Sequence, residues 1–194
     1  MKDFHLINEG RAFADFVKPC KLIGKGSFAR VYELDDQRVL KLTCDPANAA
    51  VLCHQSRTAK PGRAFPVVFE DLGRAAECAD CSYYGCVMER LQWPVGDRAE
   101  AVIQTSVEVR RRYDAEACSS VVDAAFLRAL SRHRDLDMRG ELLQLARMVE
   151  SDGWLVDRLD RGNLLARSDG QLVLSDLLYS LVPFKRVSRS FSPS

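Results

Sequence analysis

The feature that most constrains the fold is a glycine-rich bend between two short apolar segments. Residues 22–32 read LIGKGSFARVY, and residues 38–42 then read RVLKL. Because glycine has no Cβ, Gly24 and Gly26 permit backbone torsions that other residues avoid, and they let a backbone approach a ligand closely. The pattern predicts a strand, a glycine turn and a second strand, followed by a third strand that carries Lys41.

Lys41 indicates what kind of ligand this hairpin could bind. A charged side chain inside an apolar strand is costly to bury unless it meets an anion. The phosphates of a nucleotide would supply that anion, and glycine-rich turns are suited to lie over phosphates. We therefore expect ATP, with Phe28 folded over its phosphates and Val31 against its adenine. The alternative is an ordinary hairpin with a lysine on its solvent face.

A second group of polar residues lies near the other end of the chain. Residues 154–165 read WLVDRLDRGNLL, and residues 171–178 read QLVLSDLL. Asn163 and Asp176 supply the hard oxygen ligands that Mg²⁺ prefers. The alternative is a plain β-hairpin around the turn 168–170, with both residues as ordinary loop residues.

Taken together, these motifs resemble the protein kinase family, which joins a glycine-rich loop, a strand lysine, a catalytic loop and a metal-binding aspartate. The resemblance implies an α+β, protein kinase-like bilobal fold, with a small antiparallel β-sheet N-lobe that contains one helix and a reduced, mainly helical C-lobe. Within YYGCVMERL, residues 83–91, it places Met88 at the back of the adenine pocket and the backbone of 89–91 at the adenine edge. The implied cofactor-binding residues are Gly24, Gly26, Ser27, Phe28, Val31, Lys41, Met88, Glu89 and Leu91, and the implied metal ligands are Asn163 and Asp176.

The chain departs from the family pattern at the catalytic acid. Counting back from Asn163, the family's aspartate position holds Arg158, and the neighbouring acid is Asp157. Either Asp157 or Asp160 is therefore the carboxylate expected to orient an acceptor hydroxyl, with Lys41 on the phosphates.

The family's helix glutamate, which pairs with the strand lysine, is also missing. The segment between Lys41 and Phe69 contains no Glu. We expect a helix over 46–59 in which Gln55 contacts Lys41 through a neutral hydrogen bond. The short remainder after Leu178 leaves no room for a long activation segment, so the expected kinase is a minimal one.

Hydrophobic periodicity gives the remaining organisation. We expect a helix over 10–17, three amphipathic helices after residue 94 with Arg110, Arg111 and Arg112 on a solvated face, and a hairpin of 164–165 with 172–174. The predicted strands are 20–24, 29–34, 38–43, 66–72 and 83–88. The predicted domains are an N-lobe over 1–92, a C-lobe over 93–183 and a basic, serine-rich tail over 184–194.

Composition bounds the class of protein. A 194-residue chain that is 47% hydrophobic can bury a core as one domain or two small lobes. Its net charge of +1 argues against a nucleic-acid surface, and no apolar run is long enough to span a membrane. Seven cysteines, an odd number, favour free thiols and a cytoplasmic location. The weaker alternative is zinc held by the cluster Cys78, Cys81 and Cys86, with Cys53 and His54 as the nearest further ligands.

Three functions remain open from the sequence. The first is an ATP- and magnesium-dependent Ser/Thr protein kinase acting on itself or on a partner protein, with Ser188 and Ser190 of the tail as acceptors. The second is a pseudokinase that binds nucleotide and regulates a partner. The third is a small-molecule phosphotransferase. The abbreviated chain is similar in outline to phage and bacterial effector kinases, which act in a host cytoplasm.

Overall fold

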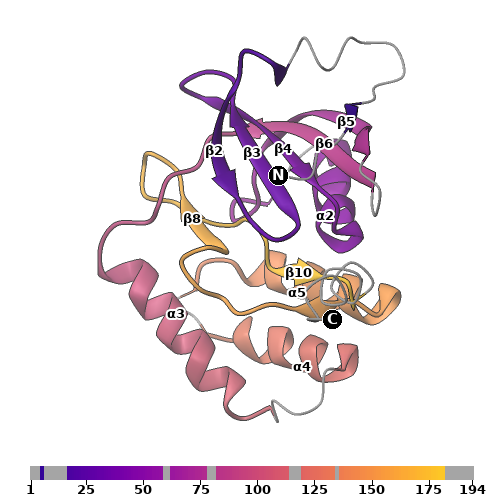
Figure 1. Ribbon diagram of the computed structural model, residues 1–194. Helices are drawn as coiled ribbons and strands as arrows, with labels where there is room; N and C mark the ends of the chain where they lie inside the picture. The colour runs from indigo at the N-terminus through magenta and orange to yellow at the C-terminus, as the bar shows by residue number, and fades with distance from the viewer. Residues whose placement is uncertain are drawn as a thin grey trace, which may run out of the picture. The chain divides into compact units, whose positions relative to one another are not determined.

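The computed structural model describes residues 5–6, 17–58, 62–77, 82–113, 119–133 and 136–181. These residues form a mixed α+β structure with an antiparallel sheet, as expected, and they divide into two compact units (Figure 1). The first unit contains Met1–Ala59, Val67–Arg90 and Ser180–Ser194, and the second contains Lys60–Pro66 and Leu91–Tyr179. The helix predicted over 10–17 and the tail over 184–194 fall almost wholly outside the described residues.

The first unit is built on one antiparallel sheet with the strand order β1-β5-β6-β4-β3-β2. Helix α2 packs against β4, β5 and β6. The strands are β1 (His5–Leu6), β2 (Lys21–Lys25), β3 (Ala29–Glu33), β4 (Arg38–Thr43), β5 (Val68–Glu77) and β6 (Ser82–Glu89), and α2 spans Pro46–Arg57. The five strands and the helix predicted in this part of the sequence are confirmed, with ends shifted by a few residues.

Strand β4 is buried on both of its faces. Because side chains alternate along a strand, Lys41 lies on one face, whereas Leu40 and Leu42 lie on the other. Leu40 and Leu42 are fully buried, in a cluster that is completed by residues from the neighbouring strands and from the segment before β2. The other members of this cluster are Val17, Cys44, Ala75, Ala76 and Tyr83.

Strand β5 extends five residues further than the predicted segment 66–72. Gly73 has a positive φ of 61°, and the register with β6 shifts at three points along the strand. Each shift inserts an extra residue, which bends the strand without ending it. A glycine that is read from sequence as a strand terminator is here part of a bulge, and pairing with β6 continues to Glu77.

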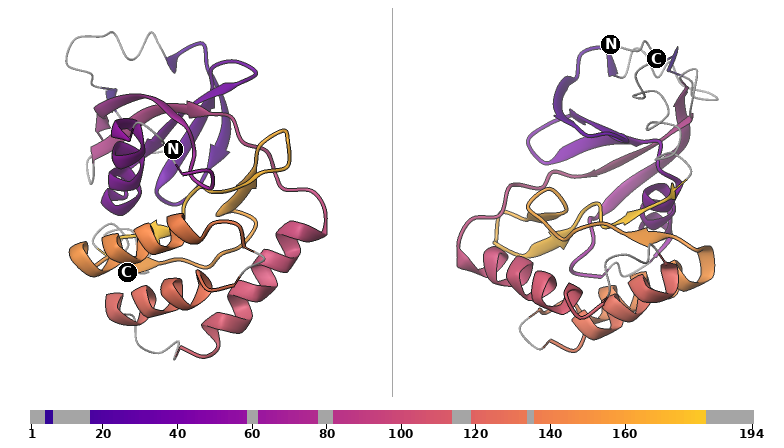
Figure 2. Two further views of the ribbon diagram at one scale, coloured as in Figure 1. Left: turned by 180° about the vertical axis from the view of Figure 1, so that it is seen from behind. Right: turned by 60° about the horizontal axis from the view of Figure 1, so that its bottom comes forward.

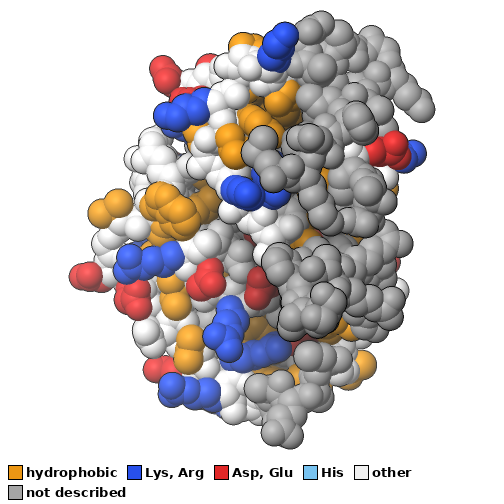
Figure 3. Space-filling model, in the orientation of Figure 1, with side chains coloured by type: hydrophobic (Ala, Val, Ile, Leu, Met, Phe, Trp, Pro, Cys, Tyr) orange, Lys and Arg blue, Asp and Glu red, His pale blue; other side chains and the backbone are white. Residues whose placement is uncertain are grey.

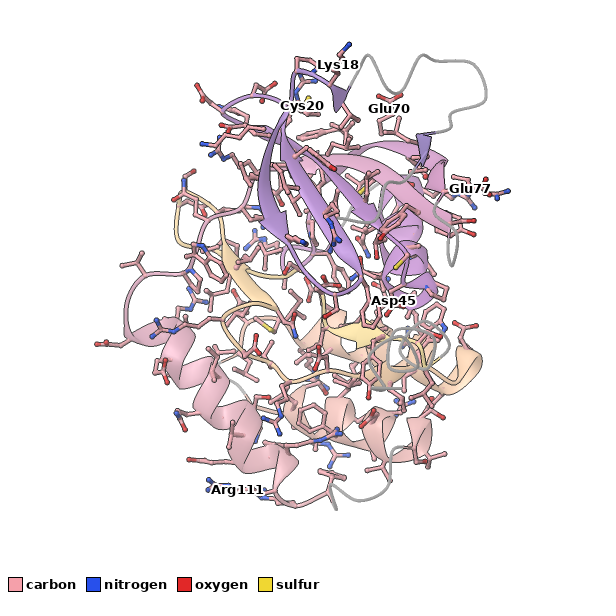
Figure 4. All side chains as sticks on the ribbon, viewed as in Figure 1. Lys18, Cys20, Asp45, Glu70, Glu77 and Arg111 are labelled. Atoms are coloured by element: carbon pink, nitrogen blue, oxygen red, sulfur yellow. The ribbon has the colours of Figure 1, made fainter. Side chains whose placement is uncertain are left out.

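Helix α2 begins at a buried aspartate that is labelled in Figure 4. Asp45 is 3% exposed, and its Oδ1 accepts a hydrogen bond from Ala47 N at 2.8 Å. Pro46 follows at the first helical turn, where its missing N–H costs nothing. The Asp45 carboxylate also accepts from Ser180 N, at 3.2 and 3.1 Å for its two oxygens. This bond ties residue 180 to the first turn of α2.

The described part of the second unit contains three helices and two small sheets. Helix α3 spans Asp97–Arg110, α4 spans Ser120–Leu130 and α5 spans Arg139–Asp152, as the periodicity predicted. Helices α4 and α5 lie side by side in both views of Figure 2 and form the largest helix contact of the unit. Their facing side chains are almost fully buried: Ala124, Phe126, Leu127, Leu130, Leu142, Leu145, Ala146 and Val149.

The two small sheets follow α5 along the chain. Strand β7 (Leu155–Val156) pairs with β10 (Leu178–Tyr179), and β8 (Leu164–Ala166) pairs with β9 (Leu172–Leu174). The β8–β9 hairpin was predicted, and its turn contains a glycine with a φ of 83°, Gly170. The β7–β10 pair was not predicted, because two-residue strands carry no period.

The segment between α2 and β5 belongs to the second unit. Its Phe65 is 1% exposed, and Arg167 donates to the carbonyls of Arg63 and Phe65 at 2.5 and 2.8 Å. Glu141 of α5 accepts from Ala64 N at 3.1 Å. The chain therefore passes through the second unit before it returns to form β5. Among the described helices, none has the length and apolarity that crossing a bilayer requires.

Candidate functional site

In the first unit, one row of paired residues runs across five strands of the sheet, from β2 to β5. Gly24 pairs with Val31, Val31 with Lys41, and Lys41 with Cys86, and Cys86 in turn pairs with Asp71 on β5. Paired residues of antiparallel strands direct their side chains to the same face. Three of the predicted site residues therefore share one face of the sheet, with Lys41 on the middle strand of the row.

Met88 lies on that face as well, since it follows Cys86 by two residues on β6. The next residues take part in hydrogen bonds within the first unit. Glu89 N donates to Val67 O at 2.9 Å, and Arg90 N donates to Gln37 O at 2.7 Å. These two N–H groups are thus not available to an adenine edge, and Leu91 is left as the predicted backbone donor.

The glycine turn differs from its prediction in one respect. The described glycines with positive φ are Gly73, Gly96, Gly153 and Gly170, so neither Gly24 nor Gly26 uses a torsion closed to other residues. The space around the two glycines differs. A Cβ on Gly24 would lie 3.2 Å from the Val31 Cβ, and a Cβ on Gly26 would meet nothing within 4 Å.

The turn is held by backbone hydrogen bonds and by one arginine. Gly26 N donates to Ala29 O at 3.0 Å, and the Arg30 guanidinium donates to Gly26 O at 2.8 Å. Ser27 is exposed next to them. The backbone of the turn is therefore closed by its own hydrogen bonds, with open space next to Gly26.

Phe28 does not stand free at the tip of the hairpin. It is half-buried and packs against the hydrophobic cluster that contains Leu40 and Leu42, which lie on the face of β4 opposite to Lys41. Its carbonyl accepts from Cys44 N at 2.8 Å. We expected this side chain to cover phosphates, but it anchors the hairpin to the sheet. Burying an aromatic ring in an apolar cluster is energetically more favourable than leaving it exposed in a turn.

Lys41 is 5% exposed, as expected for a lysine in an apolar strand. The predicted hydrogen bond from Gln55 to Lys41 is wrong, because the buried Oε1 of Gln55 has no hydrogen-bond partner, and a lysine can only donate. The thiol of Cys86, next to Lys41 in the row, is deeply buried. Burial raises the pKa of Cys86 to about 12, with Lys41 acting to lower it and Asp71 to raise it.

A cavity of about 360 Å³ opens between α2 and the face of the sheet that carries this row. Asp71 at its wall accepts a hydrogen bond from the Cys53 thiol, and burial together with this bond raises the pKa of Cys53. Asp71 was not predicted, because the bulged register that aligns it with Cys86 cannot be derived from sequence periodicity. The lining residues are Thr43, Pro46, Ala49, Ala50, Leu52, Cys53, Arg57, Asp71, Gly73, Tyr84, Gly85 and Cys86.

In the second unit, the loop before β8 is folded around Asp160. Its Oδ1 accepts from Gly162 N at 2.7 Å and from Asn163 N at 3.2 Å. Asn163 N and Leu164 N also approach the Asp160 carbonyl, at 3.2 and 2.9 Å. Asp160 therefore closes the turn that leads into β8, which is the usual role of an aspartate that bonds to the backbone a few residues on.

The same loop brings the two predicted metal ligands near each other. Asn163 O accepts from Ser175 N at 2.9 Å, and Ser175 is the residue before Asp176. The Asn163 side chain donates through Nδ2 to Arg158 O at 2.7 Å, which directs its oxygen away from that bond. The loop thus holds one amide oxygen and one carboxylate on adjacent backbone segments.

An amide oxygen and a carboxylate are ligand types that Mg²⁺ accepts. Mg²⁺ takes hard oxygen ligands and keeps several waters, so it needs few protein ligands when phosphates are present. Asn163 and Asp176 are both partly exposed. No group of three or more His, Cys, Asp or Glu side chains suited to a metal occurs within the described residues, and Cys78 and Cys81 lie outside them.

Asp157 lies at the start of the loop, directly after β7. Its backbone N donates to Leu177 O at 2.9 Å, and its exposed carboxylate accepts from Arg158 N at 2.7 Å. The two segments that carry Asp157 and Asp176 are therefore adjacent, joined by the β7–β10 pair.

A buried carboxylate that the sequence did not point to lies beneath β7. Asp123 of α4 is 2% exposed, and its Oδ2 accepts from Val156 N at 2.7 Å. Its Oδ1 accepts from Arg110 at 2.5 Å, and the Arg110 guanidinium stacks over Phe126 at 4.9 Å. Arg110 was predicted on a solvated face, and this pairing corrects that prediction, while Arg111 is exposed as expected.

Charges of both signs are mixed over the drawn face of the second unit in Figure 3. Comparison of the chain with protein-family models and with curated proteins found no match. The candidate site therefore rests on the arrangement of its own residues.

Proposed function

We propose that this chain is a minimal, protein kinase-like enzyme that binds ATP with Mg²⁺ and transfers the γ-phosphate to Ser or Thr hydroxyls of itself or of a partner protein. The observation that carries the proposal is the row of the first unit in which a glycine turn, Val31 and a buried lysine share one face. The strand order supports it, since three consecutive strands are followed by a helix and two more strands in one antiparallel sheet.

Each candidate group has a role in this proposal. Lys41 neutralises phosphate charge, and Asn163 and Asp176 hold the magnesium ion, which supplies further neutralisation of the phosphates when bound. Asp157 is the better of the two carboxylates for orienting the acceptor hydroxyl, because the Oδ1 of Asp160 already accepts two N–H groups to close its turn. The cytoplasm and a protein partner remain part of the proposal.

The test is labelling with γ-phosphate-labelled ATP and Mg²⁺, read by mass spectrometry of the protein. We expect Mg²⁺-dependent incorporation that is lost in Lys41→Ala and in Asp176→Ala. The matched controls are Lys21→Ala and Asp169→Asn, which change an exposed lysine on β2 and an exposed aspartate in the β8–β9 turn. Equal labelling in Lys41→Ala and wild type would contradict the proposal.

A second function, a pseudokinase, is favoured by one observation. Counting back from Asn163, Arg158 stands in the sequence where the family pattern has its acid. In that case Mg²⁺ and ATP raise the melting temperature, Lys41→Ala removes the shift, and no phosphate is transferred. The melting shift and the labelling assay together separate the two functions.

A further inference from the structure

We infer that Asp123 is a positioning residue for the proposed phosphate transfer: from α4, it fixes the backbone on which Asp157 and Asp176 are both mounted. This inference rests on the proposed function for its catalytic part and on the geometry of the second unit for its structural part. All of the residues involved belong to that unit.

The first step is the anchor itself. Both oxygens of Asp123 are engaged, one by the Arg110 guanidinium at 2.5 Å and the other by Val156 N at 2.7 Å. A carboxylate that is 2% exposed is costly to bury unless such partners satisfy it. Removal of Asp123 would leave the Val156 N–H and the Arg110 guanidinium without this partner. Because the Asp123 carboxylate is buried, water does not readily replace it in either hydrogen bond.

The second step is the connection from the anchor to the candidate catalytic groups. Val156 pairs with Leu178 in the β7–β10 ladder. The next residue, Asp157, donates its backbone N–H to Leu177 O. Asp123 therefore holds the residue before Asp157 directly, and through one strand pair it holds the two residues after Asp176.

The third step is the absence of another buried anchor at this place. Among the described residues, Asp45, Asp123 and Lys41 are the buried side chains that carry a formal charge, and of these only Asp123 lies in the second unit. The loop from Asp157 onward is exposed at most positions. Partners that orient metal ligands and catalytic groups typically change metal affinity or activity by roughly 10- to 100-fold when they are lost.

The test compares Asp123→Asn with a matched control, Glu150→Gln. Glu150 of α5 forms an exposed ion pair with Arg128 of α4, and its described hydrogen bonds do not reach β7. In Asp123→Asn we expect a roughly 10- to 100-fold rise in the Mg²⁺ concentration for half-maximal labelling, or an equal fall in labelling rate. The apparent KM for ATP is expected to change little, and Glu150→Gln is expected to match wild type in every measurement.

Hydrogen–deuterium exchange supplies a readout that does not need activity. In wild type we expect the amides of Val156 and Asp157 to exchange as slowly as those of the β8–β9 ladder. In Asp123→Asn we expect faster exchange at these two amides and at 177–178, with β8–β9 unchanged. If Asp123→Asn does not fold, the exchange rate of the Val156 amide in wild type tests the inference instead. Rapid exchange at that amide overturns it.

The outcomes separate this inference from the proposed function. A folded Asp123→Asn protein with wild-type Mg²⁺ dependence and labelling rate overturns the positioning role and leaves the kinase proposal intact. A wild-type protein that transfers no phosphate overturns the kinase proposal, and the exchange at Val156 then supports or overturns the anchor by itself.

Discussion

The two units place their candidate functional groups by different means. In the first unit, Lys41 is positioned by the ladder of β4 with β3 and β6, so its place depends on backbone pairing. In the second unit, Asn163 and Asp157 lie in a loop whose shape depends on individual carboxylates, Asp160 within the loop and Asp123 beneath it. A ladder distributes its stability over many bonds, whereas a loop of this kind loses its geometry with one side chain.

The helices beneath that loop are the part of the second unit with the largest predicted effect. Leu142 of α5 is fully buried, and Leu142→Ala is expected to lower the free energy of unfolding by about 2–5 kcal/mol, because it removes buried methyl groups and leaves a cavity. Denaturant titration measures this loss. Val121→Ala is the control, since Val121 is 73% exposed, and it is expected to stay within about 0.5 kcal/mol of wild type.

If Leu142→Ala unfolded no more easily than Val121→Ala, the second unit would not depend on its helical core. The loop would then be held by something other than the helices beneath it, and the contrast between the two units would have to be abandoned.

The tightness of the first unit's sheet is tested at Gly85 of β6. A Cβ added there would lie 2.8 Å from the Ala75 Cβ and 3.2 Å from Leu42 Cδ2. Gly85→Ala is therefore expected to cost about 1–3 kcal/mol through overpacking. The same change at Gly140 in α5 meets nothing within 4 Å and is expected to stabilise by roughly 0.4–1 kcal/mol.

Thermal unfolding of the two glycine variants measures both changes in stability, which are expected to have opposite signs. Stabilisation by Gly85→Ala would show that the sheet relaxes easily, and the view of a rigid ladder around Lys41 would fail.

A smaller effect is expected at Asp160, which closes the loop in the second unit. Asp160→Ala removes the acceptor of two N–H groups and is expected to cost about 1 kcal/mol, as for a helix cap. Asp160→Asn keeps an acceptor oxygen and is expected to cost only a few tenths of the roughly 1 kcal/mol lost in Asp160→Ala. Chemical denaturation of the pair separates the hydrogen bonds from the charge, and equal losses in both variants would assign the effect to charge instead.

The effect that is smallest at neutral pH, where the thiol is protonated in both states, concerns Cys86 in the row of Lys41. Burial raises its pKa to about 12, from an ordinary value of 9.0. Above pH 9 the unfolded chain loses this proton while the folded protein keeps it, so stability is complete below about pH 9 and falls as the pH rises toward 12. Unfolding measured at several pH values should show this slope in wild type and a weaker slope in Cys86→Ala.

Thiol labelling gives an independent measurement of the same burial. At pH 8, iodoacetamide is expected to modify the half-buried Cys20 of the folded protein and to modify Cys86 only after unfolding. Rapid modification of Cys86 in the native protein would show that this part of the row is open.

Much of the fold could be predicted from the sequence because strands β2 to β6 and helices α2 to α5 carry local periodicity and clear turns. The β7–β10 pair, the bulges of β5 and the role of Asp123 could not. Each depends on which distant segments meet, and a two-residue strand or a single acid in a helix carries no such information. Phe28 shows the same limit, since a turn sequence does not tell whether its aromatic ring faces solvent or the core.

The bond between Asp45 and Ser180 has a consequence for how the protein is made. These residues are 135 positions apart, yet they meet within the first unit, next to the first turn of α2. During synthesis, the nascent sheet and helix emerge from the ribosome well before residue 180 does. Until then the Asp45 carboxylate keeps its bond to Ala47 but lacks the one to Ser180, so the first unit reaches its final hydrogen bonding only after the second has been translated.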